Sequence, residues 1–234
     1  MPLQVVESRR LYRQIADQLR GLIDGGEYAI GARLPPERDL ALQLGVSRPS
    51  VREALIALEV EGRVEVRMGS GIYVRRPDAA AAAKPVLAES PLDTLHARQL
   101  IERELAAYAA EHMNDAQIAG LNAAVDAMQR EFDAGIAPMA GDKLFHVRIA
   151  EASDNSVLIR LVGELFDERQ NPLSRQLDSH FQNDRSWQAT IAEHRAVVAA
   201  IASRTPDAAR RAMADHLAAV HERLTAQWPA EAAA

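Results

Sequence analysis

The sequence predicts a mainly α-helical protein with two domains: an N-terminal domain of short helices with one small β-hairpin, and a C-terminal antiparallel all-α helical bundle. Three observations support this fold class. Alanine and leucine dominate a composition that is 48% apolar and only 4% aromatic, which favours helices over sheets. The front of the chain contains helical apolar stripes followed by two alternating runs around a glycine turn, and nothing from residue 90 onward alternates with strand period. We expect an N-terminal domain at 1–76, an alanine-rich linker at 77–89, the bundle at 90–228 and a tail at 229–234.

The first predicted helix ends before the Gly25-Gly26 pair. Its apolar face is formed by Leu11, Ile15, Leu19, Leu22 and Ile23. Residues 28–31 are expected to form a short strand edge.

A second helix is predicted from the proline pair at 35–36 to Leu44, and Gly45 supplies the left-handed conformation that follows many helix ends. Ser47 caps a third helix, which stops before Gly62. Two short helices joined by a tight glycine turn are typical of a helix-turn-helix. The alternating runs 63–67 and 72–75 then predict a β-hairpin, so the whole domain is expected to be a winged helix-turn-helix.

The third helix has an apolar side and a basic end. Its apolar side contains Val51, Ala54, Leu55 and Leu58. We expect Arg48, Pro49 and Arg52 to lie near its N-terminal end, away from that side. The same end of a recognition helix meets base edges in the major groove, where arginine can bind guanine through two hydrogen bonds. A generic amphipathic helix pair is the alternative, but the cap, turn, arginines and hairpin occur in the order that DNA binding requires.

Charge is divided unevenly along the chain, whose formal net charge is −6. Residues 1–76 hold 12 Lys/Arg and 10 Asp/Glu, whereas the remainder holds 15 and 23. A weakly basic head on an acidic body fits a protein that docks one small face on DNA. The absence of cysteine excludes disulfides and thiolate metal sites and fits a reducing compartment. The N-terminus lacks the apolar core of a signal peptide, so we expect a cytoplasmic protein without a membrane partner.

Residues 9 to 76 closely resemble the winged-helix head of the GntR superfamily of bacterial transcription regulators. The resemblance is carried by L-P-P-E-R-D-L-A, G-V-S-R-P-S-V-R-E-A-L, L-E-V-E-G-R-V and G-S-G-I-Y-V. It implies that Arg38, Arg48 and Arg52 hold phosphates and bases. It further implies supporting contacts at Ser47, Pro49 and Ser50, and that Gly69 brings the wing tip to the minor groove.

The second domain is expected to contain helices joined by short connections. The predicted ranges are 90–111, 114–134, 139–152, 155–169, 173–181, 187–203 and 206–228. Asp142 and His146 are four residues apart, so both project from one helix face about 6 Å apart. His194 and His216 lie on two later helices with apolar neighbours. One carboxylate and three imidazoles on three helices form a ligand set that suits Zn²⁺, Ni²⁺ or Mn²⁺. The alternative is that each is an ordinary buried histidine, and His180 is the rival ligand or effector contact.

This domain resembles the all-helical effector domain of the FadR-like branch of the same superfamily. The matching pieces are H-A-R-Q-L-I-E-R-E-L-A-A-Y-A-A, D-K-L-F-H-V-R-I-A-E-A-S-D-N-S-V-L, E-H-R-A-V-V-A-A-I and A-A-R-R-A-M-A-D-H-L. The resemblance implies that Asp142, His146, His194 and His216 bind a divalent metal ion and that Arg98 pairs with an effector carboxylate. It places Asn155 at a helix cap or near the pocket, and we favour the cap. Glu102 is interpreted as a hydrogen-bond partner within the bundle rather than as a ligand.

The stretch F-D-E-R-Q-N-P-L-S-R resembles, less closely, the hexuronate-responsive regulators of this branch. Arg169 and Arg175 are therefore either contacts for a sugar acid or surface residues. The predicted function is a DNA-binding transcription regulator, a repressor, that responds to a small organic acid and acts as a homodimer on a near-palindromic operator. Two alternatives are a metal-dependent hydrolase-type enzyme, for which no catalytic motif is found, and a metal-free regulator that senses an apolar acyl ligand.

Overall fold

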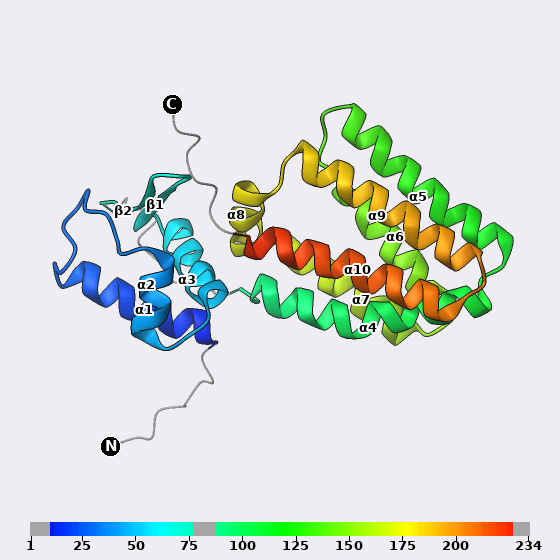
Figure 1. Ribbon diagram of the computed structural model, residues 1–234, viewed down its shortest axis with the longest axis horizontal. Helices are drawn as coiled ribbons and strands as arrows, with labels where there is room; N and C mark the ends of the chain where they lie inside the picture. Colours follow the sequence, from blue (N-terminus) through cyan, green and yellow to red (C-terminus); the bar gives the residue numbers. More distant parts are fainter. Residues whose placement is uncertain (1–9, 77–87, 227–234) are drawn as a thin grey trace, which may run out of the picture. The chain divides into compact units, whose positions relative to one another are not determined.

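A computed structural model describes residues 10–76 and 88–226 of the chain. They form two compact units, each mainly helical (Figure 1). One unit, the head, contains the described residues up to Ser90 together with Pro172–His180, and the other, the bundle, contains Pro91–Asn171 and Phe181–Ala226. The expected linker at 77–89 lies outside the described residues except for its last two, and the expected tail at 229–234 lies outside them entirely.

Three helices of the head begin and end close to their predicted positions. They are α1 (Leu11–Asp24), α2 (Glu37–Leu44) and α3 (Arg48–Val60). Gly45 follows α2 in the left-handed conformation with a φ of 66°, and the Ser47 hydroxyl accepts a hydrogen bond of 3.2 Å from Ser50 N at the start of α3. Helices α1 and α3 pack against each other, and their buried residues include Ile15, Leu19, Val51 and Leu55. The predicted helix-turn-helix is therefore formed.

A two-stranded antiparallel hairpin follows α3. Strands β1 (Val64–Arg67) and β2 (Gly71–Val74) pair Val66 with Ile72, and Val64 and Val74, which pair at one end of the register, are both buried. The expected strand edge at 28–31 is wrong. Gly31 has a φ of 84° and turns the chain, after which residues 31–34 hydrogen-bond to β2, for example from Leu34 N to Ile72 O at 2.8 Å. The edge forms three residues later than expected because the turn comes first.

One helix from the second half of the sequence contributes to the head. This helix is α8 (Pro172–Phe181). His180 Nε2 lies 2.6 Å from Glu59 Oε2, and the Gln176 side-chain amide donates to the same carboxylate at 3.0 Å. The other oxygen of Glu59 accepts a hydrogen bond of 2.8 Å from Val66 N. His180 thus contacts the end of α3.

The bundle is built, over 91–171 and 181–226, from helices close to those predicted. They are α4 (Pro91–His112), α5 (Asp115–Asp133), α6 (Met139–Glu151), α7 (Ser156–Asp167), the short 3₁₀ helix η1 (Glu168–Gln170), α9 (Asp184–Ala202) and α10 (Pro206–Thr225). Capping explains the starts of α5, α7 and α9: Asn114 and Asn183 each form a reciprocal capping box, and Asn155 accepts hydrogen bonds from Val157 N and Leu158 N. The box at Asn183 makes α9 begin three residues before the expected position.

Within the bundle α4 lies beside α10, and α5 lies beside α6 and α9 (Figure 1). The close approach of α5 and α6 depends on Gly141. A Cβ atom at this position would lie 2.6 Å from Met128 Cγ and 2.8 Å from Met128 N, closer than real side chains approach. Gly141 immediately precedes Asp142, so this packing places one of the expected ligands. Among the described residues, no helix combines the length and apolar character needed to cross a bilayer.

Candidate metal centre and DNA interface

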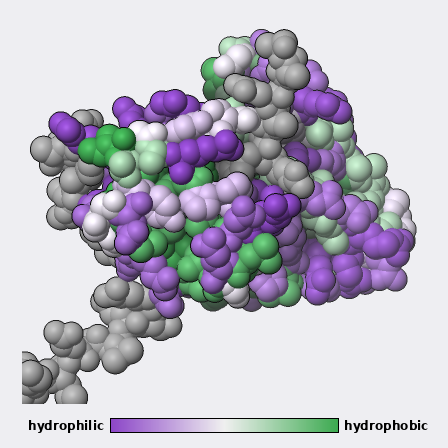
Figure 2. All heavy atoms as spheres, turned by 60° about the vertical axis from the view of Figure 1, so that its left-hand side comes forward, coloured by the Kyte–Doolittle hydropathy of each residue, from purple (hydrophilic) through white to green (hydrophobic). Residues whose placement is uncertain are grey.

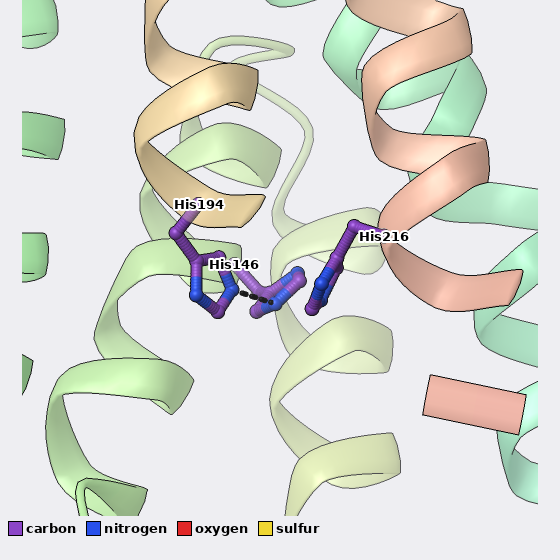
Figure 3. A group of neighbouring side chains, drawn as sticks. All are labelled: His146, His194 and His216. Atoms are coloured by element: carbon purple, nitrogen blue, oxygen red, sulfur yellow. Dashed lines mark hydrogen bonds between the residues drawn. The ribbon is translucent and has the colours of Figure 1, made fainter. Parts of the chain in front are cut away.

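Four side chains from three helices meet inside the bundle. Helix α6 carries Asp142 and His146 one turn apart, α9 carries His194, and α10 carries His216. None of the four is more than 3% exposed. Figure 3 shows the three imidazole rings turned toward one another, with His146 and His194 in contact. The structure therefore brings together the residues that the sequence suggests as a ligand set.

The spacing of the donor atoms fits a divalent ion. The Nε2 atoms of His146 and His194 are 3.0 Å apart, and Asp142 Oδ1 lies 3.4 Å from each of them. Two ligands that each lie about 2.1 Å from an ion are about 3.0 Å apart at a right angle and about 3.4 Å apart at the tetrahedral angle. One nitrogen from each of the three histidines lies within 4.8 Å of the others. A donor set of one carboxylate and three imidazoles suits Zn²⁺, Ni²⁺ or Mn²⁺.

Two further carboxylates hold imidazole rings at the nitrogen away from the centre. Glu102 Oε2, on α4, lies 2.5 Å from His146 Nδ1, and Glu193 Oε2, on α9, lies 2.8 Å from His216 Nδ1. An ionised carboxylate only accepts hydrogen bonds, so the nitrogen that faces it carries the proton. The Nε2 atoms of both rings then keep the lone pair that a metal requires.

Both of these carboxylates are ionised at neutral pH. Burial by itself would raise the pKa of Glu102, but the interactions with Arg98 and His146 outweigh it and lower the pKa to about 2. Burial also opposes ionisation of Glu193, whereas hydrogen bonds from two α10 side chains lower its pKa to about 2. An ionised carboxylate therefore faces Nδ1 of each of the two rings, His146 and His216.

Three of the four proposed donors, Asp142, His194 and His216, have pKa values shifted toward the protonation states that bind a cation. Burial lowers the pKa of His194 well below its usual value, and it lowers the pKa of His216 despite the opposing hydrogen bond to Glu193. Burial would raise the pKa of Asp142, but Arg169 and the neighbouring histidines hold it well below its usual range. Neutral imidazoles and an ionised carboxylate are the forms that coordinate metals.

Two arginines lie beside this cluster. Arg98 donates from Nε to Glu102 Oε1 at 2.6 Å, and its Nη2 lies 3.3 Å from His146 Nε2. Arg169, on η1, donates to Asp142 Oδ2 at 2.5 Å. Both line a cavity of about 10 Å³, which is room for about one water molecule. The other lining residues are Asp142, Gln182, Trp187, Thr190, His216 and Val220.

Sequence reasoning missed part of this constellation. It identified Glu102 as a bundle hydrogen-bond partner, but it did not find Glu193 or Arg223. Glu193 directly precedes His194, and Arg223 follows His216 by seven residues, which places it two turns along the same face of α10. That spacing was the available signal. Gln182 had none, because it reaches the cavity from a connection between helices.

The proposed DNA-contacting residues of the head lie at the start of α3, on α2 and at the wing tip. Ser47 and Gly69 are exposed, the Arg38 side chain is 75% exposed, and that of Arg48 is 39% exposed. Pro49 and Ser50 are half-buried. Hydrophilic and hydrophobic side chains are interspersed over the surface turned to the viewer in Figure 2.

Arg52 does not lie where the sequence suggests. It is 2% exposed, and its Nη2 donates to Glu37 Oε2 at 2.9 Å. Glu37 is the first residue of α2 and is itself buried, and Arg48 Nη2 lies 3.8 Å from the same oxygen. The expectation that Arg52 lies away from the apolar side is wrong because Glu37 draws its guanidinium inward. A DNA contact by Arg52 stays a prediction, and it requires Glu37 to share or release this group.

Three other residues with open roles are placed by the structure. Asn155 caps α7, as favoured. Arg175 is exposed on α8, and His180 pairs with Glu59 rather than joining the histidine cluster. Arg169, by contrast, lies beside the proposed ligands.

Comparison with known proteins agrees with both domains. Residues 11–74 match the family of bacterial regulatory proteins of gntR type, and residues 93–219 match the FCD domain. The chain is 37% identical to the Uxu operon transcriptional regulator of Escherichia coli (strain K12) over 230 residues, covering 93% of this chain and 88% of the relative. It is also 37% identical to the Exu regulon transcriptional regulator of the same strain over 221 residues, covering 92% and 84%.

A solved structure, E. coli McbR/YncC, shares the fold. It superimposes with a TM-score of 0.51 at 22% identity and covers 94% of this chain and 99% of its own. The sequence relatives are regulators of transcription rather than enzymes. The chain therefore belongs to the gntR family of bacterial regulatory proteins and carries an FCD domain C-terminal to its DNA-binding head.

Proposed function

We propose that this transcription regulator is a repressor whose operator affinity is changed by a small organic acid, bound together with a divalent metal ion in the bundle. The observation that carries the proposal is the buried cluster of Asp142, His146, His194 and His216 with arginine side chains beside it. Burying three imidazoles and a carboxylate together brings no packing advantage over burying leucine, whereas a bound ion would use every one of these donors.

The four residues would hold the ion through Oδ1 of Asp142 and one nitrogen of each histidine. When bound, the ion supplies positive charge and open coordination positions for the carboxylate and hydroxyl of an acid. Four protein donors leave two such positions on an octahedral ion. Arg98 would pair with the acid's carboxylate while staying bonded to Glu102, which keeps its guanidinium oriented.

A sugar acid is the leading effector class. The chain resembles hexuronate-responsive regulators in sequence, and its relatives are named as the Uxu and Exu regulators. A sugar acid cannot fit a cavity with room for about one water molecule, so its binding requires a rearrangement. Arg169 is the side chain whose departure from Asp142 would both enlarge the cavity and free an oxygen. Arg169 would then bond to the acid instead.

The charged lining argues against an apolar acyl effector. Arg98, Asp142, Arg169 and His216 face the cavity, and an acyl chain there would leave these polar groups without compensation. The hydrolase alternative has no support from relatives, which are regulators.

On the DNA side, we propose a homodimer that places two heads on the half-sites of a near-palindromic operator. Arg38, Ser47, Arg48, Pro49, Ser50 and Gly69 would contact the duplex, and Arg52 would do so after Glu37 yields its guanidinium. Binding of the acid would change the relative placement of the two heads and thereby the operator affinity.

Elemental analysis tests the metal part. Full-length protein purified without chelators or a metal column should hold about one divalent ion per chain. His194→Ala should lose it, whereas His112→Ala, at an exposed histidine of α4, should retain it. Titration of the loaded protein with sugar acids and simple hydroxy acids, followed by calorimetry, then tests the effector class. Wild-type protein that takes up no ion would overturn the metal part, and preferential binding of a fatty acyl ligand would overturn the acid.

A further inference from the structure

The ring of His216 is fixed by a chain of contacts that leads away from the proposed metal centre. His216 Nδ1 donates to Glu193 Oε2 at 2.8 Å, so the two residues join α10 to α9. Arg223 donates two hydrogen bonds to the same carboxylate, from Nη1 to Oε1 at 2.6 Å and from Nη2 to Oε2 at 3.0 Å. Its Nη2 also lies 3.2 Å from the Thr190 hydroxyl. This two-point contact fixes the Glu193 carboxylate in the orientation that accepts the hydrogen bond from His216 Nδ1.

His146 is held in the same manner by other residues. Glu102 Oε2 lies 2.5 Å from its Nδ1, and Arg98 Nε donates to Glu102 Oε1 at 2.6 Å. Two of the three imidazoles thus face a carboxylate that an arginine holds in turn. Among the described residues the buried Nδ1 atoms of His146 and His194 both lack a hydrogen bond of good geometry, but only that of His146 lies close to a carboxylate.

The two arginine–glutamate pairs differ in what else they touch. Arg98 lines the cavity proposed for the acid, so a change in that pair would alter effector binding as well. Glu193 and Arg223 do not line the cavity, and both side chains are 22% exposed. A change at Glu193 therefore removes no group that lines the cavity.

We propose that Glu193 and Arg223 are positioning residues for the metal centre, which set ion affinity by fixing the orientation and tautomer of His216. This inference rests on the proposed metal binding. A carboxylate that accepts from one ring nitrogen keeps the proton there, aims the other nitrogen at the ion and raises its basicity. Without Glu193, the ring can rotate and can carry its proton on Nε2, where it blocks coordination.

If the role of Glu193 and Arg223 were purely structural, the pair would only join α9 to α10. The chain offers a matched control for that role. Arg210 on α10 donates to Glu104 on α4 through Nε and Nη2, at 3.0 to 3.1 Å, and neither residue contacts a histidine of the cluster. Both pairs tie α10 to a neighbouring helix, but only one reaches an imidazole.

The test measures Zn²⁺ affinity of metal-free full-length protein by competition with a chromophoric chelator. Glu193→Ala should bind Zn²⁺ 10- to 100-fold more weakly than wild type, on the scale found for residues that orient metal ligands. Glu193→Gln should lose less, since its amide oxygen can still accept from Nδ1. Glu104→Ala should match wild type. Co²⁺ offers a second readout, because its visible absorption reports coordination geometry, and Glu193→Ala should alter that spectrum whereas Glu104→Ala should not.

Each outcome separates the two levels of the argument. Wild-type protein that binds neither ion refutes the proposed metal centre and this inference with it. Wild-type protein that binds Zn²⁺ while Glu193→Ala binds within twofold of it, with an unchanged Co²⁺ spectrum, refutes only the positioning role. If Glu193→Ala does not fold, Arg223→Met provides the test, because it keeps the Glu193–His216 hydrogen bond but removes the two hydrogen bonds from Arg223. We expect Arg223→Met to lose less Zn²⁺ affinity than Glu193→Ala would. Wild-type affinity in Arg223→Met would overturn the assignment.

Discussion

Replacement of Gly141 by alanine should destabilise the bundle, although alanine normally strengthens a helix. In a helix interior, glycine is about 0.5–1 kcal/mol less favourable than alanine. At Gly141, however, the added Cβ would meet Met128 Cγ at 2.6 Å, Met128 N at 2.8 Å and Met128 Cα at 3.1 Å. The methionine side chain can rotate away, but its backbone cannot, so α5 and α6 must separate. Overpacking of this kind costs about 1–3 kcal/mol, and the upper end applies where backbone must move. The net loss in unfolding free energy is then about 2 kcal/mol.

Gly163 provides the matched control. It lies inside α7, and a Cβ there would have no heavy atom within 4 Å. Gly163→Ala should therefore raise the unfolding free energy by about 0.5–1 kcal/mol. Urea denaturation of both full-length variants in the presence of a chelator, followed by far-ultraviolet circular dichroism, measures the difference. Because Asp142 follows Gly141, Gly141→Ala should also weaken Zn²⁺ binding, whereas Gly163→Ala should not. Equal stability of the two variants would refute the assigned contact between α5 and α6.

Three further predictions concern charged and titratable groups. Arg52→Ala leaves the carboxylate of Glu37 buried, so it should lower the unfolding free energy by about 3 kcal/mol, the low end for a broken buried pair because Arg48 lies nearby. Arg48→Ala should leave stability within about 0.5 kcal/mol of wild type but should cost about 1–3 kcal/mol of preference for operator over random DNA. Urea denaturation measures the stability of each variant, and titrations with operator and random DNA measure the binding preference. If Arg52→Ala is as stable as wild type, Glu37 does not hold Arg52 in a buried ion pair. The third is the pH dependence of stability: burial lowers the pKa of His194 and His216 in the folded chain, so the unfolded chain binds more protons at a pH below the usual value of 6.5. In chelator-treated protein, the stability that these two histidines contribute is fully present above that pH. It is lost as the pH falls below that value, by up to about 1.4 kcal/mol of unfolding free energy per pH unit for each histidine. A melting temperature that does not fall between pH 7 and pH 5, or a loss as large in a variant with both histidines replaced, would contradict this.

Local sequence signals predicted most of the fold. Ser47, Asn114 and Asn155 cap helices because short polar side chains satisfy the exposed N–H groups of a first turn, and this chemistry is readable from a single sequence. Gly45 ends α2 for an equally local reason. The start of α9 was misplaced because a Trp187-based apolar pattern begins later than the cap at Asn183.

The interior arrangement of charges was less predictable. Arg52 was expected near the DNA-facing end because helical periodicity describes one helix at a time, whereas its burial depends on Glu37 from another helix. The candidate ligand set was identified mainly through the resemblance to the FadR-like branch, since a carboxylate and a histidine at helical spacing are common by chance. Glu193 was not, because a glutamate beside a histidine also occurs on any solvated helix face. Nor does periodicity indicate that α8 packs within the head unit, since that depends on His180 and Gln176 meeting Glu59.

The measurement that tests the central claim most directly is operator binding as a function of acid, with and without metal. Full-length protein loaded with Zn²⁺ should change its operator affinity at least about fivefold when its cognate sugar acid is added, and operator DNA should change the affinity for the acid by the same factor. Chelated wild-type protein and loaded His112→Ala are the paired controls, of which only the second should respond. An equal response in chelated protein, or operator affinity that no acid alters, would contradict the proposal that an acid held at the bundle's metal centre controls the head.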